Sequence, residues 1–193
     1  MVRRSTSTRR RLTPGDWADA ALTAIAEGGL AAVAVEPLAA RLGTTKGSFY
    51  WHFAGREALL EAALTRWEEW TTSAVVVEIS NDANPPAEQL RHLIVRTIEI
   101  AEQDRVGPAL QANATHPAVA RTLDRVTRAR IELITTVFIR LGYAAQEAHL
   151  RALLAYSAYL GHAQLAHATP QVLPATDDER RAYLDRVVHL LTR

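Results

Sequence analysis

The sequence predicts an all-α protein in which a small N-terminal module of three helices precedes a larger helical body. Apolar residues recur at helical spacing along most of the chain, and glycine and proline divide these stretches into separate segments. No stretch shows a convincing strand pattern. With 193 residues, of which 48% are hydrophobic, the chain can form one large or two small globular domains.

The first helix is expected to begin at Thr13, whose hydroxyl can cap it. Pro14 suits the first helical position, and Asp16 faces the positive end of the helix dipole. Gly28 and Gly29 then end the helix. Its apolar stripe consists of Trp17, Ala20, Ala21, Ala24, Ile25 and Gly28.

Two short helices are expected to follow. The stripe of the first consists of Val35, Leu38, Ala39 and Leu42. Gly43 ends this helix, and Pro37 is tolerated because it lies in the first turn. Thr45 can cap a third helix through Phe53, in which Phe49 and Phe53 are i, i+4 neighbours. Such short helices are stable only when their apolar faces pack on one another.

Residues 55 to about 80 are expected to form a long fourth helix, before a polar break at 80–86. Its apolar side carries Leu59, Leu60, Ala63, Leu64, Trp67 and Trp70. Further helices are expected near residues 87–104, 106–113, 117–141, 145–168 and 177–192. We therefore divide the chain into a basic tail (1–11), a helix-turn-helix domain (12–54) and a C-terminal helical domain (55–193).

The segment from Gly43 to Arg56 has the layout of a DNA-reading element. A helix, a tight turn and a short helix with polar and aromatic side chains form a helix-turn-helix, whose second helix enters the major groove. Lys46, the only lysine in the chain, could reach guanine O6 and N7. Gly47 allows close backbone approach, and Ser48 is small enough to meet a base edge.

Phosphate contacts are expected around these base-reading residues. Thr45 and the first amides of the helix can receive a phosphate, and Tyr50, His52 and Arg56 can donate to others. Tyr50 and Trp51 taken alone could equally be packing aromatics, and His52 a surface histidine. Their occurrence together, in order after Gly43, favours DNA binding.

The run from Gly43 to Phe53, followed by Arg56-Glu57-Ala58-Leu59-Leu60, resembles the recognition segment of the tetracycline-repressor-like (TetR) family. The resemblance is specific over residues 12–60 and elsewhere extends only to the number and spacing of helices. It implies a homodimeric transcriptional regulator that binds a palindromic operator, usually a repressor released by a small molecule in its C-terminal domain. An activator or a ligand-independent regulator is the alternative.

Matching positions imply which residues contact DNA: bases for Lys46, Gly47 and Ser48, and backbone sugars for Trp51. The complete set is Thr44, Thr45, Lys46, Gly47, Ser48, Tyr50, Trp51, His52 and Arg56.

The sequence departs from the family pattern just before this segment. Ala34 stands where a capping Thr or Ser is common, at a cost of about 1 kcal/mol. Glu36, followed by Pro37, stands where a polar or basic residue can touch DNA, and a carboxylate there repels phosphates unless it accepts from a cytosine amino group. Arg56 replaces the usual Lys. Specificity is therefore expected to depend heavily on Lys46.

Positive charge is concentrated at the N-terminus, although the net charge of the chain is only +1. The first eleven residues contain Arg3, Arg4, Arg9, Arg10 and Arg11 and no acid. This segment is either a solvated tail or an arm whose arginines reach the minor groove.

The last two long helices carry apolar stripes suited to association. The stripes are Leu150, Leu153, Leu154, Ser157, Leu160, Gly161 and Gln164 on one helix, and Leu184, Val187, Val188 and Leu191 on the other. A homodimer through a four-helix bundle is expected, with packing inside one chain as the alternative. DNA geometry also favours a dimer, because two reading helices must lie about 34 Å apart.

A ligand chamber in the C-terminal domain is a further hypothesis. Its candidate residues are Trp67, Trp70, Gln103, Asn113, Tyr156 and Tyr159. Aromatic side chains with a few polar groups suit a largely apolar or aromatic effector, although such aromatics are also ordinary core residues.

Other function classes have little support. The chain has no cysteine, no HExxH motif and no glycine-rich phosphate loop, so we expect no metal, no cofactor and no catalytic site. An enzyme and a helical protein-interaction module are remote alternatives. No apolar stretch approaches membrane-spanning length, and no apolar segment follows the basic N-terminus as in a secretory signal, so a cytoplasmic location is expected.

Overall fold

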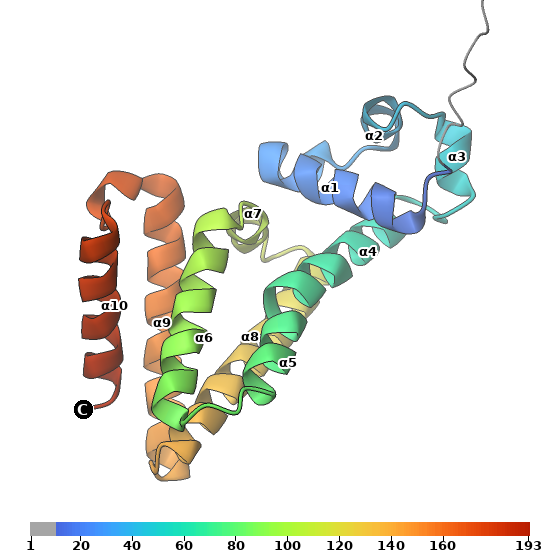
Figure 1. Ribbon diagram of the computed structural model, residues 1–193. Helices are drawn as coiled ribbons and strands as arrows, with labels where there is room; N and C mark the ends of the chain where they lie inside the picture. Colours follow the sequence, from blue (N-terminus) through green and yellow to red (C-terminus); the bar gives the residue numbers. More distant parts are fainter. Residues whose placement is uncertain (1–10) are drawn as a thin grey trace, which may run out of the picture. The chain divides into compact units, whose positions relative to one another are not determined.

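The computed structural model describes residues 11–193, which fold into two compact units that divide between Ala63 and Leu64. These residues contain helices and no β-strand, which confirms the predicted all-α class (Figure 1). The division falls further along the chain than residue 54, where the sequence places the end of the DNA-binding domain. Of the predicted tail, residues 1–10 lie outside the described part of the chain, and Arg11 is exposed.

The first unit is built from short helices. They are α1 (Pro14–Gly28), the 3-10 turn η1 (Leu30–Ala32), α2 (Val35–Arg41), α3 (Lys46–Tyr50) and the start of α4 (Arg56–Glu68). The helix α1 begins as predicted, because Thr13 and Asp16 form a reciprocal cap: the Thr13 side chain accepts from the Asp16 amide, and the Asp16 carboxylate accepts from the Thr13 amide at 2.7 Å. Ala34 provides no side-chain cap for α2.

Aromatic side chains hold the core of this unit together. Trp17 and Phe49 are both fully buried, and their rings meet edge to face with centroids 5.3 Å apart. Phe49 also stacks on Phe53 at 5.5 Å. The helix α3 ends at Tyr50, earlier than the predicted Phe53, because the amides of His52 and Phe53 both donate to the Phe49 carbonyl and the chain turns tightly there.

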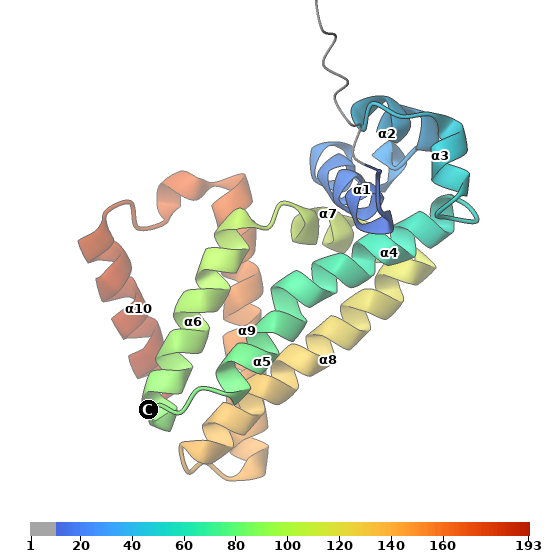
Figure 2. The same ribbon diagram turned by 45° about the vertical axis from the view of Figure 1, so that its right-hand side comes forward.

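The second unit contains the longer helices. From α4 the chain continues through the π-helical turn η2 (Glu69–Ser73) into α5 (Ala74–Ser80). Then come α6 (Pro86–Gln103), α7 (Val106–Ala112), α8 (Pro117–Arg140), α9 (Ala145–Ala168), the 3-10 turn η3 (Pro170–Val172) and α10 (Asp177–Leu191). The helix α6 packs against α8, α9 and α10, and α8 packs against α9 (Figure 2).

The core of the second unit joins α5, α6, α8, α9 and α10. Its buried members are Val75, Ile79, Leu90, Leu93, Ile94, Ile100, Leu133, Val137, Phe138, Ala148, Ala152 and Leu191. Leu184, Val187 and Val188 pack against this cluster. The apolar stripe of α10, predicted from the sequence to serve association, therefore packs inside its own chain. Within residues 11–193, no helix is both long enough and apolar enough to cross a membrane.

Candidate nucleic-acid interface and ligand cavity

A glycine turn joins α2 to α3. Gly43 adopts φ = +62°, a left-handed conformation that strains any residue with a side chain. The Gly43 amide donates to the Ala40 carbonyl at 3.1 Å, and the Thr44 amide donates to the Ala39 carbonyl at 2.9 Å. This pair of bonds is a Schellman motif, which ends α2 and sets the direction in which α3 begins.

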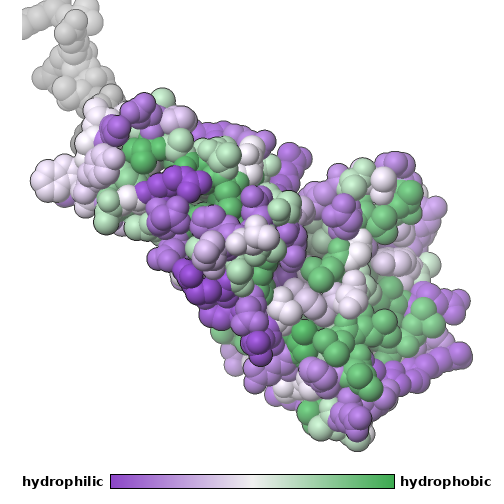
Figure 3. All heavy atoms as spheres, turned by 180° about the vertical axis from the view of Figure 1, so that it is seen from behind, coloured by the Kyte–Doolittle hydropathy of each residue, from purple (hydrophilic) through white to green (hydrophobic). Residues whose placement is uncertain are grey.

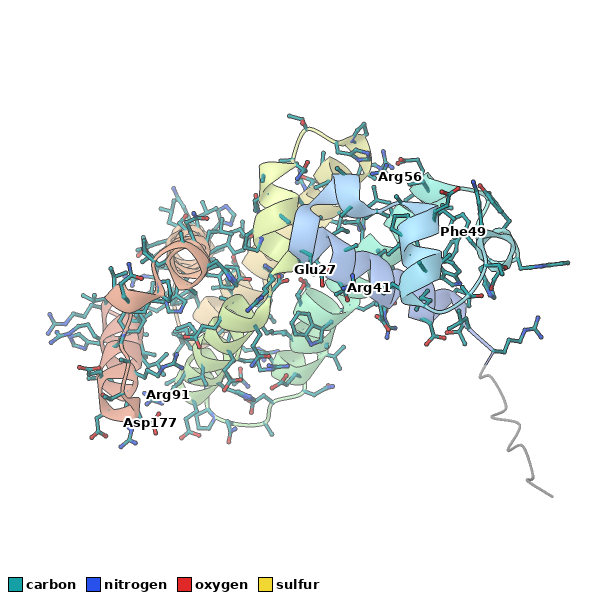
Figure 4. The ribbon with its side chains drawn as sticks, turned by 90° about the horizontal axis from the view of Figure 1, so that it is seen from above. Glu27, Arg41, Phe49, Arg56, Arg91 and Asp177 are labelled. Carbon is teal, nitrogen blue, oxygen red and sulfur yellow. The ribbon has the colours of Figure 1, made fainter. Side chains whose placement is uncertain are left out.

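The helix α3 has an anchored side and an open side. Thr45 caps it as predicted, accepting from the Ser48 amide at 3.4 Å. Phe49 points into the core (Figure 4), whereas Tyr50 is 56% exposed and Trp51 is 87% exposed. An indole this exposed does not pack within its own unit, so the alternative interpretation of Trp51 as a packing aromatic fails.

Three further predicted contact residues, Gly47, Ser48 and His52, are exposed or partly exposed to solvent. Ser48 and His52 are half-buried beside the exposed residues. A Cβ built on the exposed Gly47 would meet only Thr45 Oγ1 at 3.6 Å, which is an ordinary contact. The fold itself therefore does not require glycine at position 47.

Glu36, the acidic residue that conflicts with a polyanion partner, is paired with the predicted base-reading lysine. Lys46 Nζ donates to Glu36 Oε1 at 2.8 Å, and the two side chains are 53% and 73% exposed. This hydrogen bond raises the pKa of Lys46 and lowers that of Glu36. The carboxylate therefore holds Lys46 in place from the neighbouring helix.

The side chain of Arg56 makes contacts within its own unit that the sequence did not predict. Its Nε donates to the Val33 carbonyl at 2.8 Å, and one terminal nitrogen donates to the Leu30 carbonyl at 2.6 Å. The other terminal nitrogen pairs with Glu57 at 2.9 Å. The guanidinium, predicted to donate to phosphate, thus fastens the start of α4 to the η1 segment.

A further ion pair fastens α2 to α1. Arg41, in the last turn of α2, pairs with Glu27 at 2.5 Å, and the two labelled side chains lie together in Figure 4. This pair lowers the pKa of Glu27 and raises that of Arg41 through their hydrogen bond. It is exposed and therefore adds little to stability.

Side chains of the second unit line a main cavity and a smaller one. The main cavity is lined, mostly with aliphatic side chains, by η2, α5, α6, α8, α9 and α10. The smaller cavity includes Trp67 and Asp104 in its lining. Arg130, Tyr156 and Tyr159 line both cavities.

The predicted ligand residues are thus divided. Trp67, Tyr156 and Tyr159 line a cavity, whereas Trp70, Gln103 and Asn113 line neither. Trp70 is 44% exposed, and the side-chain amide of Asn113 donates to the Ala109 carbonyl at 2.8 Å.

The π-helical turn explains why Trp67 is buried whereas Trp70 is exposed. The wider turn over Glu69–Ser73 brings Thr71 and Thr72 into the interior, and both line the main cavity. Spacing in an ordinary helix gives no sign of such a turn, so these two threonines could not be predicted.

Arg130 is a cavity residue that sequence analysis missed. Its Nε donates to Thr72 Oγ1 at 2.9 Å, and its terminal nitrogens donate to Tyr159 Oη at 3.1 Å and the Thr71 carbonyl at 3.3 Å. The guanidinium also lies over the rings of Trp67 and Tyr159, 5.8 and 5.3 Å from their centroids. The available signal was its position in the apolar stripe of α8, between the buried Val126 and Leu133.

His162 is the second missed residue of the main cavity. It is 5% exposed, and neither ring nitrogen has a hydrogen-bond partner. Its ring stacks on Tyr183 with centroids 5.9 Å apart, and Glu102 Oε1 is 3.6 Å from Nε2. Burial lowers the pKa of His162, because it disfavours the charged ring. Across residues 11–193, no group of three or more His, Asp or Glu side chains is arranged to hold a metal ion.

One face of α9 is both apolar and exposed. Its large exposed residues are Leu150 at 54%, Leu153 at 39%, Leu154 at 61%, Leu160 at 37% and Leu165 at 40%. Figure 3 shows hydrophobic atoms gathered on the surface of the second unit. A Cβ built on Gly161 would meet nothing within 4 Å, so its own chain does not require glycine there.

Known proteins share parts of this sequence and its fold. The model of a family described as bacterial regulatory proteins, tetR family, matches residues 18–63. A transcriptional regulator from Rhodococcus sp. Rha1 is 22% identical, with a TM-score of 0.72 and 94% of each chain covered. A TetR-like transcriptional regulator from Rhodococcus sp. RHA1 is 17% identical, with a TM-score of 0.68 and 96% of each chain covered.

A third structure is SmeT, the repressor of the Stenotrophomonas maltophilia multidrug efflux pump SmeDEF. It is 19% identical, with a TM-score of 0.66, and the match covers 94% of this chain and 87% of SmeT. No curated protein matches the chain. The family match over the N-terminal residues and the shared fold confirm the resemblance seen in the sequence.

Proposed function

We propose, from the match of residues 18–63 to the family of bacterial regulatory proteins, tetR family, that this protein is a dimeric, sequence-specific repressor of transcription. The observation that carries the proposal is the open side of α3. There Tyr50 and Trp51 are exposed beside Lys46 while Phe49 anchors the helix to the core. Large aromatic side chains held out in this way are suited to a partner surface.

Each predicted contact residue in and beside α3 has a proposed role. Lys46, Gly47 and Ser48 address base edges in the major groove. Trp51 packs on the backbone sugars. Thr44, Thr45, Tyr50 and His52 address phosphates. Arg56 is assigned to the structure of the unit because its guanidinium binds the Val33 and Leu30 carbonyls and its charge is paired with that of Glu57.

The proposed dimer forms through the exposed face of α9, including Leu150 and Leu154. A contiguous apolar face rarely remains exposed on a monomeric protein. A two-fold arrangement would place the same face of the partner's α9 against it, with Gly161 permitting close approach. Two DNA-binding units so joined read two half-sites of a palindrome.

Control by a small molecule is the last part of the proposal. The main cavity offers a binding site, and an occupant would favour a dimer whose DNA-binding units no longer match the half-site spacing. A repressor would then leave its operator. An activator with the same DNA-binding unit is the alternative, and a transcription assay on the operator-bearing promoter distinguishes the two by the sign of its effect.

The central test is binding-site selection with the purified protein on genomic fragments and random DNA. We expect a palindromic sequence to be enriched by the native protein and enrichment to be lost or relaxed with Lys46→Ala. Arg128→Ala is the matched control, because Arg128 is an exposed basic residue of α8 in the second unit. If the native protein enriches no sequence, the proposed function is wrong.

The interface has its own test by analytical ultracentrifugation. Leu154→Glu places a charge on the exposed α9 face and should yield a folded monomer. Val77→Glu alters an equally exposed apolar residue of α5, which is 59% exposed, and should leave the dimer intact. A dimeric Leu154→Glu protein would show that α9 does not form the interface.

A further inference from the structure

We propose that the main cavity of the second unit binds a largely aliphatic carboxylic acid, whose carboxylate pairs with Arg130 and whose polar end also takes a hydrogen bond from His162. This inference deepens the proposed ligand control and rests on it only for its regulatory consequence. It follows from a positive charge without an anion, a buried histidine whose ring nitrogens have no hydrogen-bond partner, and an aliphatic lining.

Arg130 is a partly buried cation held entirely by neutral groups. Its partners are the Thr72 hydroxyl, the Thr71 carbonyl and the Tyr159 hydroxyl, and no carboxylate of residues 11–193 lies within ion-pair distance of it. Charges removed from water are ordinarily paired with an opposite charge. The guanidinium has five N–H donors. Its three hydrogen bonds use one donor on each nitrogen, so one donor remains on each terminal nitrogen. Donors on the two terminal nitrogens can bind a carboxylate.

The acidic residues around the cavities are already committed to other groups. Asp104, which is 5% exposed, accepts from Trp67 Nε1 at 2.9 Å and from the amides of Val106 and Gly107. A Cβ on Gly107 would come within 2.6 Å of Asp104 Oδ2, so the fold is shaped tightly around this carboxylate. Glu102 pairs with Arg180 at 2.9 Å. The anion for Arg130 must therefore come from a ligand.

His162 adds an independent sign that something polar enters the main cavity. An unsatisfied buried polar group destabilises the empty protein, and this ring has two such nitrogens. The ring follows Tyr159 by three residues on α9, so the two side chains are neighbours on one face of the helix. Tyr159 also accepts a hydrogen bond from Arg130, so it links the arginine to the face of α9 that carries His162.

The remaining wall specifies the rest of the ligand. Val75, Leu93, Ile94, Leu133, Ile134 and Val187 contribute aliphatic surface from α5, α6, α8 and α10. A mostly aliphatic wall with a few polar groups is the usual lining of a small-molecule site. An acid with a hydrocarbon body matches both the single charged end and the uniform wall.

The test compares three probes of equal chain length on the full-length protein by isothermal titration calorimetry: decanoic acid, decanol and methyl decanoate. We expect the acid to bind the native protein about tenfold or more tighter than the alcohol or the ester. Arg130→Gln should reduce acid binding to the level of the alcohol. Arg128→Gln is the matched control, since Arg128 lies on the same helix with its side chain 78% exposed and should keep the preference.

Equal binding of the three probes, binding of none of them, or an acid preference that survives Arg130→Gln would overturn the proposal. Should Arg130→Gln fail to fold, Arg130→Lys retains the charge without the planar fork, and its acid preference should fall below that of the native protein. An undiminished preference in the lysine variant overturns the role of the guanidinium.

His162→Phe provides a second test, in which the stability of the empty protein should rise while its affinity for the acid should fall. The variant should raise the melting temperature of the empty protein, because it removes unsatisfied nitrogens and keeps the ring on Tyr183. It should also weaken decanoic acid binding several-fold. A variant whose affinity is unchanged would remove His162 from the site.

Operator binding is measured separately so that failures can be told apart. Acid-selective binding without any release of operator DNA leaves the cavity assignment intact and refutes ligand control. Operator release by decanol as effectively as by decanoic acid supports ligand control and refutes the carboxylate.

Discussion

Lys46 Nζ lies 2.8 Å from Glu36 Oε1, so the lysine that we assign to base recognition is held by a carboxylate on the preceding helix. Both side chains are exposed, and such pairs add little to folding stability. The pair matters for DNA binding, because Lys46 must either break its hydrogen bond to Glu36 or keep it when the protein binds DNA. A phosphate would have to displace Glu36, whereas a G·C pair offers an acceptor to the lysine and a donor to the carboxylate.

Glu36→Gln should therefore loosen discrimination while tightening general binding. We expect affinity for random DNA to rise, and the slope of log K against log salt to steepen by about 0.9, as Lys46 becomes free for one phosphate. Fluorescence anisotropy over a range of salt concentrations measures both. Asp124→Asn, which removes a carboxylate from an exposed pair on α8, serves as the control. If the slope does not change, Glu36 does not restrain Lys46.

Gly47→Ala should separate stability from DNA binding. Alanine is favoured over glycine in a helix by up to about 1 kcal/mol, and the added Cβ meets only Thr45 Oγ1 at 3.6 Å. The melting temperature should rise slightly, while operator affinity should fall about tenfold because the methyl group stands between the backbone and the groove. Thermal unfolding and anisotropy check the two effects. Unchanged affinity would mean that the backbone at position 47 does not approach DNA closely.

Arg56→Gln distinguishes the predicted phosphate contact from the observed bonds to Leu30 and Val33. Loss of charged donors to two backbone carbonyls should lower the free energy of unfolding by about 2 kcal/mol. The salt slope of the folded protein should stay as it is. Denaturant titration and anisotropy at low temperature supply the measurements. A stable variant whose slope falls by about one would restore Arg56 to the phosphate contacts.

His92 should make stability depend on pH. Its ring nitrogens lie 2.9 Å from Glu78 Oε1 and 3.0 Å from Asp82 Oδ2, and the bond to Asp82 is the largest cause of the raised pKa of His92. A pKa raised by folding means that its contribution is fully present below the unfolded value of about 6.5 and is lost as pH rises through the folded value. Nearby, Arg96 also pairs with Glu78, which leaves the Asp82 bond to dominate.

We accordingly expect His92→Gln to lower the melting temperature most below about pH 6.5, and the gap to the native protein to close as pH rises through the raised pKa of His92. His189→Gln, at an exposed position of α10, should show no such difference. A melting-temperature gap that is constant across this range would show that His92 acts without titrating.

Much of the fold was accessible from the sequence because its boundaries are set locally. Gly43 ends α2, and Pro117 begins α8, through backbone preferences that a single residue imposes. The i, i+4 spacing of Phe49 and Phe53 predicts that they share one face of a helix, and both are buried. The short span of α3 was overestimated because its end depends on a tight turn at Phe49 that no proline or glycine announces.

The parts of the site that escaped prediction depend on distant or irregular contacts. Arg56 binds carbonyls more than twenty residues earlier in the chain, a contact that local spacing does not indicate. Trp70 leaves the apolar stripe of Trp67 because it lies within the π-helical turn. The sequence shows that Arg130 is a charged residue within an apolar stripe. Its neutral partners on η2 and α9 are brought to it only when the helices pack.

The four tryptophans are distributed so that the protein carries its own fluorescent reporters. Each unit has one buried indole, Trp17 or Trp67, and one exposed indole, Trp51 or Trp70. Emission from Trp51 should be quenched when α3 meets DNA, whereas Trp67, beside Arg130, should respond to an occupant of the cavities. Single replacements of tryptophan by phenylalanine would thus let operator binding and effector binding be followed separately in one unlabelled sample.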